Sequence, residues 1–327
     1  MPGPESASAQ AELLAGRPLI ATRKVESCIG DPLSGSTLAA HGYDFEYLSC
    51  ANDFELRRAG DVDVIFLSSQ PATDALPVIY PPSYGPFQFH EMRGAARWAR
   101  DFVQGKKAKA ILKLAGPEGR ILDVGAGSGI LLRHIARVRG SLDNLAANDF
   151  SDEILEPLRR EGFKTIVGRA ECLEPKEKFD VIILNQVLEH LENPPEVVAQ
   201  LSRLLAPGGF LFIETPSIDG LDARLFSSRY WGGYHIPRHF WIFNESSLTR
   251  VVNGAGLCMH QVRYLASPVF WIQSLHHALL DHGWRRLSKL FSEKNPLLLA
   301  PFTAFDLARI ALGGKTSNIR VVAQKAA

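Results

Sequence analysis

The sequence predicts an α/β protein built on a doubly wound, mostly parallel sheet. From about residue 120, apolar runs of strand length alternate with segments whose apolar residues recur at helical spacing. A glycine-rich turn joins the first of these runs to the first helical segment. Strands that alternate with helices in this way form a parallel sheet with helices on both faces. The expected strands are 121–124, 145–147, 165–167, 181–184, 210–213, 257–264 and 319–324, with helices at 130–138, 153–161, 195–205 and 245–254 and a turn at 207–209.

Three further stretches frame this alternating region. Residues 1–85 contain short strand-like runs and predict a small accessory segment, which ends in a proline-rich connector at 80–89. A helix is expected over 89–114. Residues 266–316 separate the last two strands and show helical periodicity, so they predict a helical insert. We therefore expect two domains, 1–85 and 86–327, with the insert inside the second.

Composition excludes several classes of protein. The 46% of hydrophobic and 22% of charged residues are typical of a globular protein. A net charge of +1 gives no broad attraction to nucleic acid. The N-terminus lacks the features of a signal peptide, and no run of 18 apolar residues occurs. The four cysteines lie far apart in the sequence, which favours reduced thiols. We expect a cytoplasmic protein without a transmembrane segment.

The glycine-rich turn indicates the kind of ligand. Gly125, Gly127 and Gly129 follow Asp123, and residue 130 is Ile where a dinucleotide-binding turn would have its third glycine. An acidic residue beside the turn contributes little to the binding of a pyrophosphate, but it suits a ligand with a cationic ammonium and sulfonium. The turn therefore favours S-adenosylmethionine over NAD.

Polar residues follow the later strands of the expected sheet. Asp149 ends the second strand, where a carboxylate can accept both hydroxyls of a ribose. Arg169-Ala170-Glu171 follows the third strand and can reach an adenine, and Asn185 ends the fourth. In an open parallel sheet, ligands bind at this edge.

Five segments occur in an order that resembles the motifs of class I S-adenosylmethionine-dependent methyltransferases: ILDVGAGSG, NDFS, GRAECL, FDVIILNQVLEHLENP and LAPGGFLFIETP. The resemblance covers about residues 86–265 and implies the seven-stranded fold of that class. It also implies S-adenosyl-L-methionine as the cofactor and S-adenosyl-L-homocysteine as the product. By the resemblance, the turn contacts the methionine part, Asp149 the ribose, and Ala170 and Glu171 the adenine. The cofactor-binding candidates are Asp123, Gly125, Ala126, Gly127, Gly129, Asp149, Phe150, Ala170, Glu171 and Asn185.

The segment Tyr80-Pro-Pro-Ser-Tyr84 resembles a connector found in some bacterial methyltransferases of sugars and secondary metabolites. In those proteins it follows a zinc-binding module with C-x-x-C pairs. Here Cys28, Cys50 and His41 supply at most three ligands, too few for a closed tetrahedral site. We expect a divergent, metal-free relative of that module.

Histidines near the fifth strand are the catalytic candidates. His235 and His239 lie in an aromatic segment after that strand, and part of it resembles the proline- and histidine-containing segment of small-molecule methyltransferases. Either histidine can serve as a general base, since imidazole titrates near neutral pH, or can order the loop through backbone hydrogen bonds. His190, in a Glu-His pair, is equally open to a catalytic or a packing role. Tyr234 completes the set.

We therefore expect methyl transfer to a small molecule, either a sugar or a hydrophobic secondary metabolite or precursor, including acceptors that carry a phosphate or prenyl group. The alternative is a non-catalytic protein that binds S-adenosylmethionine. The insert is either extra core or a homodimer interface, or a lid that walls the acceptor site or weakly touches a membrane surface through Trp284, Leu290 and nearby basic residues.

Overall fold

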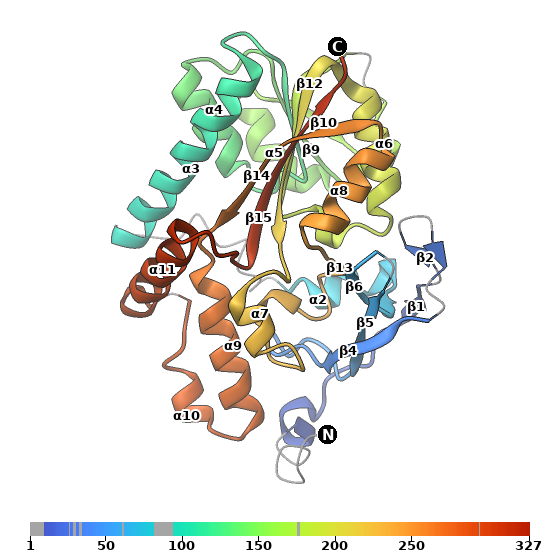
Figure 1. The fold of residues 1–327 in the computed structure, drawn as a ribbon, viewed down its shortest axis with the longest axis vertical. Helices are drawn as coiled ribbons and strands as arrows, with labels where there is room; N and C mark the ends of the chain where they lie inside the picture. Colours follow the sequence, from blue (N-terminus) through green and yellow to red (C-terminus); the bar gives the residue numbers. More distant parts are fainter. Residues whose placement is uncertain are drawn as a thin grey trace. The chain divides into compact units, whose positions relative to one another are not determined.

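The computed structural model describes residues 10–25, 27–28, 31–32, 35–60, 62–81, 94–174, 177–293 and 295–327 (Figure 1). Contacts between residues divide the chain into two compact units. Unit 1 combines three stretches of chain, Met1–Tyr84, Pro216–Ser247 and Tyr264–Ile319. Unit 2 combines Gly85–Thr215, Leu248–Arg263 and Arg320–Ala327. The boundary between domains at residues 85 and 86 stays a prediction, and the contacts add the insert and residues 216–247 to the unit that holds the N-terminal stretch.

Unit 2 contains the sheet that the sequence predicts. Its seven strands lie in the order β10-β9-β8-β11-β12-β15-β14, and the pairs β10–β9, β9–β8, β8–β11 and β11–β12 are parallel. The doubly wound, mostly parallel sheet is therefore confirmed. The strands are β8 (Ile121–Val124), β9 (Leu145–Asp149), β10 (Lys164–Val167), β11 (Phe179–Asn185), β12 (Leu205–Pro216), β14 (Leu257–Leu265) and β15 (Asn318–Lys325).

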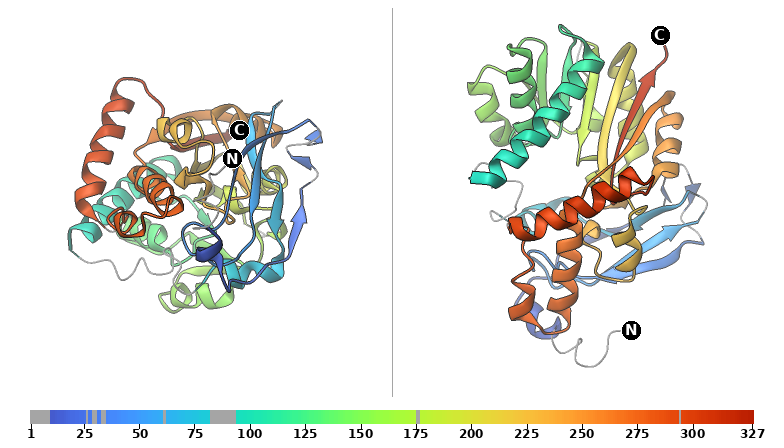
Figure 2. Two further views of the ribbon diagram at one scale, coloured as in Figure 1. Left: turned by 90° about the horizontal axis from the view of Figure 1, so that it is seen from below. Right: turned by 60° about the vertical axis from the view of Figure 1, so that its left-hand side comes forward.

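Helices cover this sheet because their apolar sides match its apolar faces. They are α3 (Gly94–Ala115), α4 (Ile130–Arg139), α5 (Asp152–Arg160), α6 (Pro194–Leu204) and α8 (Glu245–Gly254). Figure 2 shows α3 and α4 side by side, as their many contacts require. The side chain of Ser151 caps α5 by accepting a hydrogen bond from Ile154 N (3.4 Å), which leaves Asp149 available for another role.

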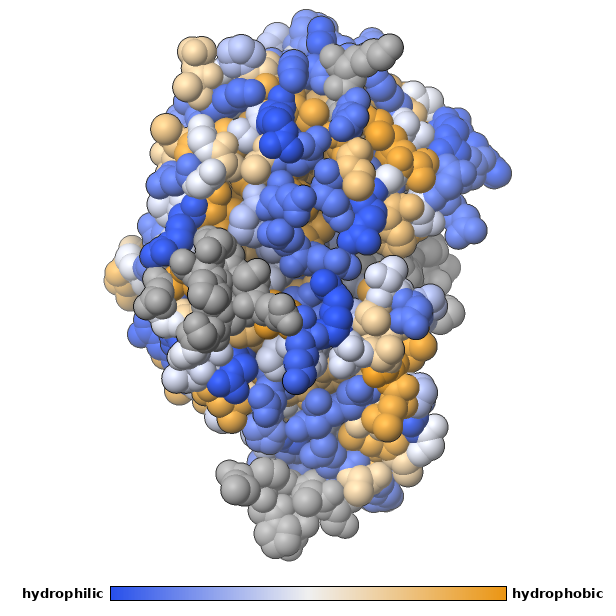
Figure 3. Space-filling model, turned by 90° about the vertical axis from the view of Figure 1, so that its right-hand side faces the viewer, coloured by the Kyte–Doolittle hydropathy of each residue, from blue (hydrophilic) through white to orange (hydrophobic). Residues whose placement is uncertain are grey.

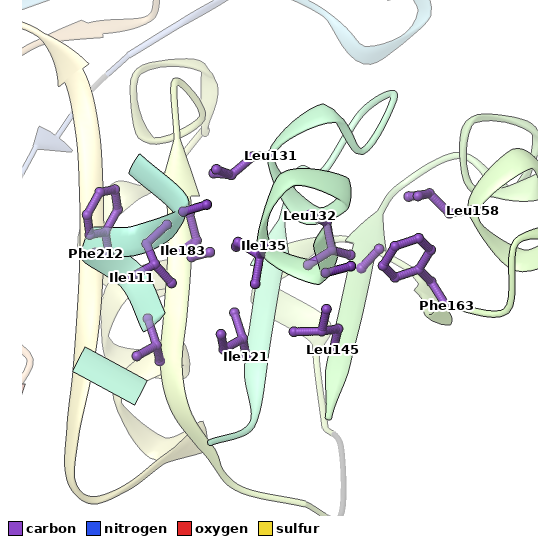
Figure 4. Packing of buried hydrophobic residues seen from close by; sticks show 14 of the residues in the cluster. Ile111, Ile121, Leu131, Leu132, Ile135, Leu145, Leu158, Phe163, Ile183 and Phe212 are labelled. Atoms are coloured by element: carbon purple, nitrogen blue, oxygen red, sulfur yellow. The ribbon is translucent and has the colours of Figure 1, made fainter. Parts of the chain in front are cut away.

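The core of unit 2 lies between the sheet and the helices α3, α4 and α5 (Figure 4). Central strands contribute residues that are buried on both faces, which is why they read as continuous apolar runs. The cluster includes Ile111, Ile121, Leu132, Ile135, Leu145, Leu158, Phe163, Ile183 and Phe212. This packing holds the ends of β8, β9 and β11 in fixed register.

Unit 1 contains a four-stranded sheet in the order β13-β6-β5-β4. The N-terminal stretch supplies three strands, and β13 from the second stretch pairs with β6 antiparallel. The strands are β4 (Thr37–Gly42), β5 (Phe54–Ala59), β6 (Val64–Leu67) and β13 (Trp241–Ile242). Two short pairs, β1 (Thr22–Lys24) with β7 (Ser69–Pro71) and β2 (Ser27–Cys28) with β3 (Asp31–Pro32), complete its β structure in the part of the chain described.

The helices of unit 1 come mostly from the predicted insert. They are α2 (Leu76–Ile79), α7 (Leu221–Leu225), α9 (Pro268–Asp281), α10 (Arg285–Ser288) and α11 (Pro296–Ala311). Both α10 and α11 pack against α9. Among the described residues, no helix combines the length and the apolar character needed to cross a bilayer.

Two local expectations change with the structure. The expected turn at 207–209 lies inside β12, which begins at Leu205. Gly208 there has a φ of +74°, and the pairing of β11 with β12 shifts register between Phe179 and Val181, so the backbone bends without leaving the sheet. The helix expected from residue 89 is described from Gly94, and the connector lies outside the described residues after Pro81.

Candidate functional site

The turn between β8 and α4 is open to a ligand at Gly127. Gly125, Gly127 and Gly129 have φ values of +67°, +52° and +70°, in the left-handed region that favours glycine. A Cβ on Gly125 would lie 2.6 Å from a methyl carbon of Val187, and one on Gly129 would collide with Leu158. A Cβ on Gly127 would meet nothing within 4 Å. The outer two glycines therefore allow close packing, and the middle one leaves its backbone accessible.

Asp149 links this turn to the end of β9. Its Oδ2 accepts a hydrogen bond from Gly127 N (3.0 Å), and its Oδ1 accepts one from Phe150 N (2.8 Å). Burial raises the pKa of Asp149, although the hydrogen bonds from backbone N–H groups oppose that rise. Each carboxylate oxygen has a further lone pair. The side chain can therefore hold the turn and still accept hydrogen bonds from ligand hydroxyls.

Asp123, on β8, is buried at the same edge of the sheet. Burial raises the pKa of its carboxyl to about 7; Lys107 lowers the pKa and Asp149 raises it further. A carboxyl with this pKa is poised to ionise when a cation arrives.

Lys107 is a site residue that the sequence analysis missed. It lies on α3, nearly buried, and its Nζ donates hydrogen bonds to Asn185 Oδ1 (2.5 Å) and to Glu214. Glu214 also accepts a hydrogen bond from Arg320 Nε (2.5 Å). The sequence pattern that could have identified Lys107 is its position one turn before Ile111, on the side of the helix that packs into the core. This network fixes Asn185 at the end of β11.

The residues expected near the adenine lie at the end of β10. Ala170 is buried in the 3-10 helix Ala170–Cys172, and Glu171 accepts a hydrogen bond from Arg169 Nε (2.5 Å). Phe150 is 68% exposed. An exposed aromatic ring after β9 offers a flat apolar face to a ligand.

Glu189 and His190 form a short 3-10 helix after β11, Leu188–His190. Glu189 is fully buried, and its Oε2 accepts a hydrogen bond from Thr215 Oγ1 (3.0 Å). Burial raises the pKa of Glu189 to about 8, so the carboxyl is protonated at neutral pH.

In unit 1, His235 and His239 lie close together after β12. Their ring centroids are 4.8 Å apart. His235 Nδ1 lies 2.6 Å from Glu46 Oε1, and His239 Nδ1 lies 2.8 Å from Gly233 O. Burial by itself would raise the pKa of Glu46, but the charge of His235 and its hydrogen bond lower it. Glu46 is therefore an ionised partner that orients the His235 ring.

Tyr234 uses its hydroxyl inside unit 1, where Tyr234 Oη donates to Ser227 O (2.6 Å). Burial raises its pKa well above the ordinary value for a tyrosine. Both facts favour a structural role for this hydroxyl, and its catalytic role stays a prediction.

His277, on α9, is a second residue that the sequence analysis missed. It lines a small cavity of about 10 Å³, enough for one water-sized group. Its Nδ1 lies 3.2 Å from Tyr230 O, whereas its buried Nε2 has no hydrogen-bond partner among the described residues. Burial lowers the pKa of His277 to about 4, so the ring is neutral and Nε2 is an acceptor. The cavity is lined by Phe45, Glu46, Arg229, Trp231, Tyr234, His235, Ile236 and His277.

Buried ion pairs surround this cavity and join the three stretches of unit 1. Asp44 accepts two hydrogen bonds from Arg238, at 3.1 and 2.8 Å, and both side chains are fully buried. Asp281 accepts hydrogen bonds from Tyr43 (3.2 Å) and from Arg229 Nε (3.1 Å).

The residues considered as zinc ligands take part in ordinary contacts. Arg229 Nη1 lies 2.8 Å from His41 Nδ1, and Cys50 is a buried free thiol whose pKa is raised by burial. The side chain of Cys28 lies outside the described residues. The absence of metal stays a prediction.

Comparison with known proteins identifies the family. A profile of the methyltransferase domain matches residues 96–262, about half of the chain. The chain belongs to this methyltransferase family. The chain has the class I fold, and its cofactor is S-adenosyl-L-methionine. The predictions of fold and of cofactor are therefore confirmed.

Individual relatives match shorter parts of the methyltransferase. A ubiquinone biosynthesis O-methyltransferase of Shewanella pealeana is 32% identical over 104 residues, which are 29% of this chain and 43% of the relative. One of Xanthomonas oryzae is 33% identical over 114 residues, 32% of this chain and 46% of the relative. The match thus spans less than half the length of these curated relatives.

One solved structure supports the fold of the methyltransferase. The 1,6-didemethyltoxoflavin-N1-methyltransferase of Burkholderia thailandensis has a TM-score of 0.50 at 15% identity, covering 88% of this chain and all of that one. Identity at this level shows the fold alone.

The structure brings most of the predicted cofactor residues of the methyltransferase to one edge of the unit 2 sheet, at the ends of β8, β9, β10 and β11. Three catalytic candidates, Tyr234, His235 and His239, lie in unit 1, and His190 lies in unit 2. The roles of all these residues stay predictions.

Proposed function

We propose that this protein transfers a methyl group from S-adenosyl-L-methionine to a hydroxyl group of a small molecule. The observation that carries the proposal is the open backbone at Gly127 beside the Asp149 carboxylate, with Asp123 buried at the same sheet edge. When bound, the cofactor supplies the methyl group on a cationic sulfonium. It would leave as S-adenosyl-L-homocysteine once the acceptor oxygen had taken the methyl group in place of the sulfur, so the residues of the site would act mainly by alignment.

Unit 2 provides the binding residues for the cofactor. Asp149 accepts hydrogen bonds from the ribose hydroxyls, and the backbone at Gly127 borders the methionine part. Asp123 gives the site the negative charge that a cationic ligand needs. Phe150, Ala170 and Glu171 border the adenine.

The proposed base is a histidine. His235 takes the proton of the acceptor hydroxyl, and Glu46, whose Oε1 lies 2.6 Å from His235 Nδ1, orients the ring. His239, 4.8 Å away between ring centroids, is the alternative base.

The acceptor is a hydrophobic small molecule in this proposal. The names of the curated relatives support an oxygen acceptor, since they describe O-methylation in ubiquinone biosynthesis.

The test has two parts. Titration calorimetry with S-adenosyl-L-homocysteine should show binding well below millimolar concentration. Incubation with S-adenosyl-L-methionine labelled in its methyl group and a small-molecule extract should then transfer label to a product that mass spectrometry identifies. Tight binding without any transfer would support the alternative, a non-catalytic cofactor-binding protein. Absence of binding would contradict both.

His235→Ala should lower turnover of the identified acceptor by roughly 100-fold, the usual contribution of a general base. Its affinity for S-adenosyl-L-homocysteine should change less than twofold. Glu46→Gln should give an intermediate loss, because it keeps the ring in place without the charge. His282→Ala, an exposed histidine of unit 1, is the matched control. Full activity of both His235→Ala and His239→Ala would show that neither ring is the base.

Binding of the cofactor should also depend on pH through Asp123. The group has a pKa of about 7, so about a tenth of it is ionised at pH 6 and nearly all at pH 8. The ionised form binds the cationic ligand better, so affinity for S-adenosyl-L-methionine should rise about tenfold over this range. Calorimetry at both pH values measures the change. In Asp123→Asn the rise should disappear, and an unchanged rise would assign it to another group, such as Glu189.

A further inference from the structure

Helix α11 of unit 1 presents an apolar face to its surroundings. Leu297 is 82% exposed, Phe305 44%, Leu307 54%, and Leu312, just beyond the helix, 88%. The other exposed residues of the helix are Pro301 and alanines. At 3.6 residues per turn, these positions share an arc of about 160°. The exposed side of α11 thus contains no polar side chain among the described residues.

The polar side chains of α11 instead serve unit 1. Asp306 is buried and accepts hydrogen bonds from Ser267 N (2.7 Å) and Trp271 Nε1 (3.0 Å). Thr303 Oγ1 donates to Leu299 O (2.7 Å). Apolar residues therefore lie on the exposed side of α11 as well as on its packed side, where Phe302 stacks on Trp271 with ring centroids 5.7 Å apart. A typical surface helix has polar residues on its exposed side. Such a face indicates an interaction site.

Exposed aromatic, aliphatic and cationic residues occur together on α10 and the residues beside it. Trp284 is 62% exposed and Leu290 62%, and the side chains of Arg286 and Lys289 are also exposed. Both α10 and α11 pack on α9 (Figure 2). By contrast, hydrophilic residues predominate on the face drawn in Figure 3, with hydrophobic ones in scattered groups.

The charge of this segment selects the partner. Residues 266–316 contain six lysines and arginines and three acids, and two of those acids, Asp281 and Asp306, are buried in hydrogen bonds. Two of the cations, Arg285 and Lys315, pair with acids elsewhere in unit 1, so the exposed charge includes the cations Arg286 and Lys289. The whole chain has a net charge of only +1. Two copies that met through this surface would bring like charges together, whereas anionic headgroups would complement them.

We propose that α10 and α11 dock on the surface of an anionic lipid bilayer. The apolar face of α11 enters the boundary between headgroups and acyl chains, and Trp284 lies at the level of the headgroups. Arg286 and Lys289 pair with lipid phosphates. The contact is peripheral, in keeping with the described helices. It does not depend on the reaction proposed above.

The experiment is flotation of the full-length protein with vesicles of phosphatidylcholine alone or mixed with phosphatidylglycerol. We expect at least about tenfold stronger binding to the anionic vesicles, weakened by salt. The variant Leu297→Ser/Phe305→Ser/Leu312→Ser and the variant Arg286→Glu/Lys289→Glu should each lower that binding at least about tenfold. Leu19→Ser/Leu38→Ser, at exposed leucines elsewhere in unit 1, is the matched control and should bind as the unchanged protein does.

Thermal melting and calorimetry with S-adenosyl-L-homocysteine verify that each variant is folded. Equal binding to both vesicle types, or binding that neither variant lowers, would overturn the proposal. Failure to bind vesicles would also overturn the proposal. In that case the protein is either a monomer in which α11 is covered or a dimer that the triple variant dissociates. Sedimentation without lipid distinguishes those two results.

Discussion

Replacing Asp149 with alanine should weaken the binding of S-adenosyl-L-homocysteine by about 10- to 100-fold, because hydrogen bonds to a charged group contribute about 1.5–3 kcal/mol. The carboxylate accepts hydrogen bonds from Gly127 N and Phe150 N and has lone pairs left for the ribose. Asp149→Asn should have an affinity between those of the unchanged protein and Asp149→Ala, since its single carbonyl oxygen can still accept hydrogen bonds. Titration calorimetry measures all three affinities.

Direct contact with the ribose can be separated from an effect on the turn. A 2′-deoxy analogue of S-adenosyl-L-homocysteine should bind the unchanged protein more weakly than the parent ligand, and Asp149→Ala should lose that preference. Asp152→Ala, at an exposed acid three residues further on, is the matched control and should leave affinity unchanged. If Asp149→Ala bound the ligand normally, the ribose assignment would be wrong.

Replacing Asp44 with alanine should destabilise unit 1 by about 3–5 kcal/mol, the usual cost of breaking a buried ion pair. Arg238 is fully buried, and removing Asp44 leaves its charge without the two hydrogen bonds that Asp44 accepts. Glu55→Ala, which breaks the partly exposed pair with Arg57, should cost about 1 kcal/mol or less. Denaturant unfolding of each variant measures the difference.

A double variant, Asp44→Leu/Arg238→Met, should recover much of the loss because it removes both charges. A loss for Asp44→Ala no larger than for Glu55→Ala would show that the buried pair stabilises little.

The same pair makes stability depend on pH. Arg238 and Ser49 hold the pKa of Asp44 below its usual value, although burial alone would raise it. Its contribution is therefore complete above the unfolded pKa of about 3.9 and is lost as the pH falls through the lower folded value. Asp44→Ala should unfold with a shallower dependence on pH in that acidic range.

The unit 2 sheet could be predicted almost strand by strand, because its signals are local. Continuous apolar runs such as β11 and helical periodicity such as that of α8 depend on neighbouring residues, and the expected bounds of α8 match the observed ones. The turn at 207–209 was expected ahead of a strand; it lies inside β12, at the place where the pairing with β11 passes from Leu205 to Phe210.

Unit 1 could not be predicted in the same way. β13 has two residues, and it becomes a strand only by pairing with β6, far away in sequence. No periodicity can show such a partner. The association of the insert with the N-terminal stretch likewise depends on single buried pairs, such as Tyr43 with Asp281.

The candidate site likewise contains residues that could be predicted from the sequence and residues that could not. The glycines and Asp123 were predicted because a ligand-binding turn needs particular residues at close spacing, and Asp149 because it ends the next strand; their roles stay predictions. Lys107 and His277 look in sequence like an ordinary helical lysine and histidine, and Glu46 like a surface acid. Their significance comes from burial and from partners that only the folded chain supplies.

The buried pairs of unit 1 also set the order in which the protein can mature on the ribosome. The partner of Asp44, Arg238, is synthesised 194 residues later, and the partner of Tyr43, Asp281, is synthesised 238 residues later. At typical rates of synthesis, the second interval lasts roughly 10 to 50 s. Until Trp241 and Ile242 of β13 have been made, the edge of β6, with Ile65 and Phe66, lacks the strand that covers it. The nascent N-terminal stretch therefore carries an unprotected strand edge, and translation speed and chaperone access bear directly on the yield of folded enzyme.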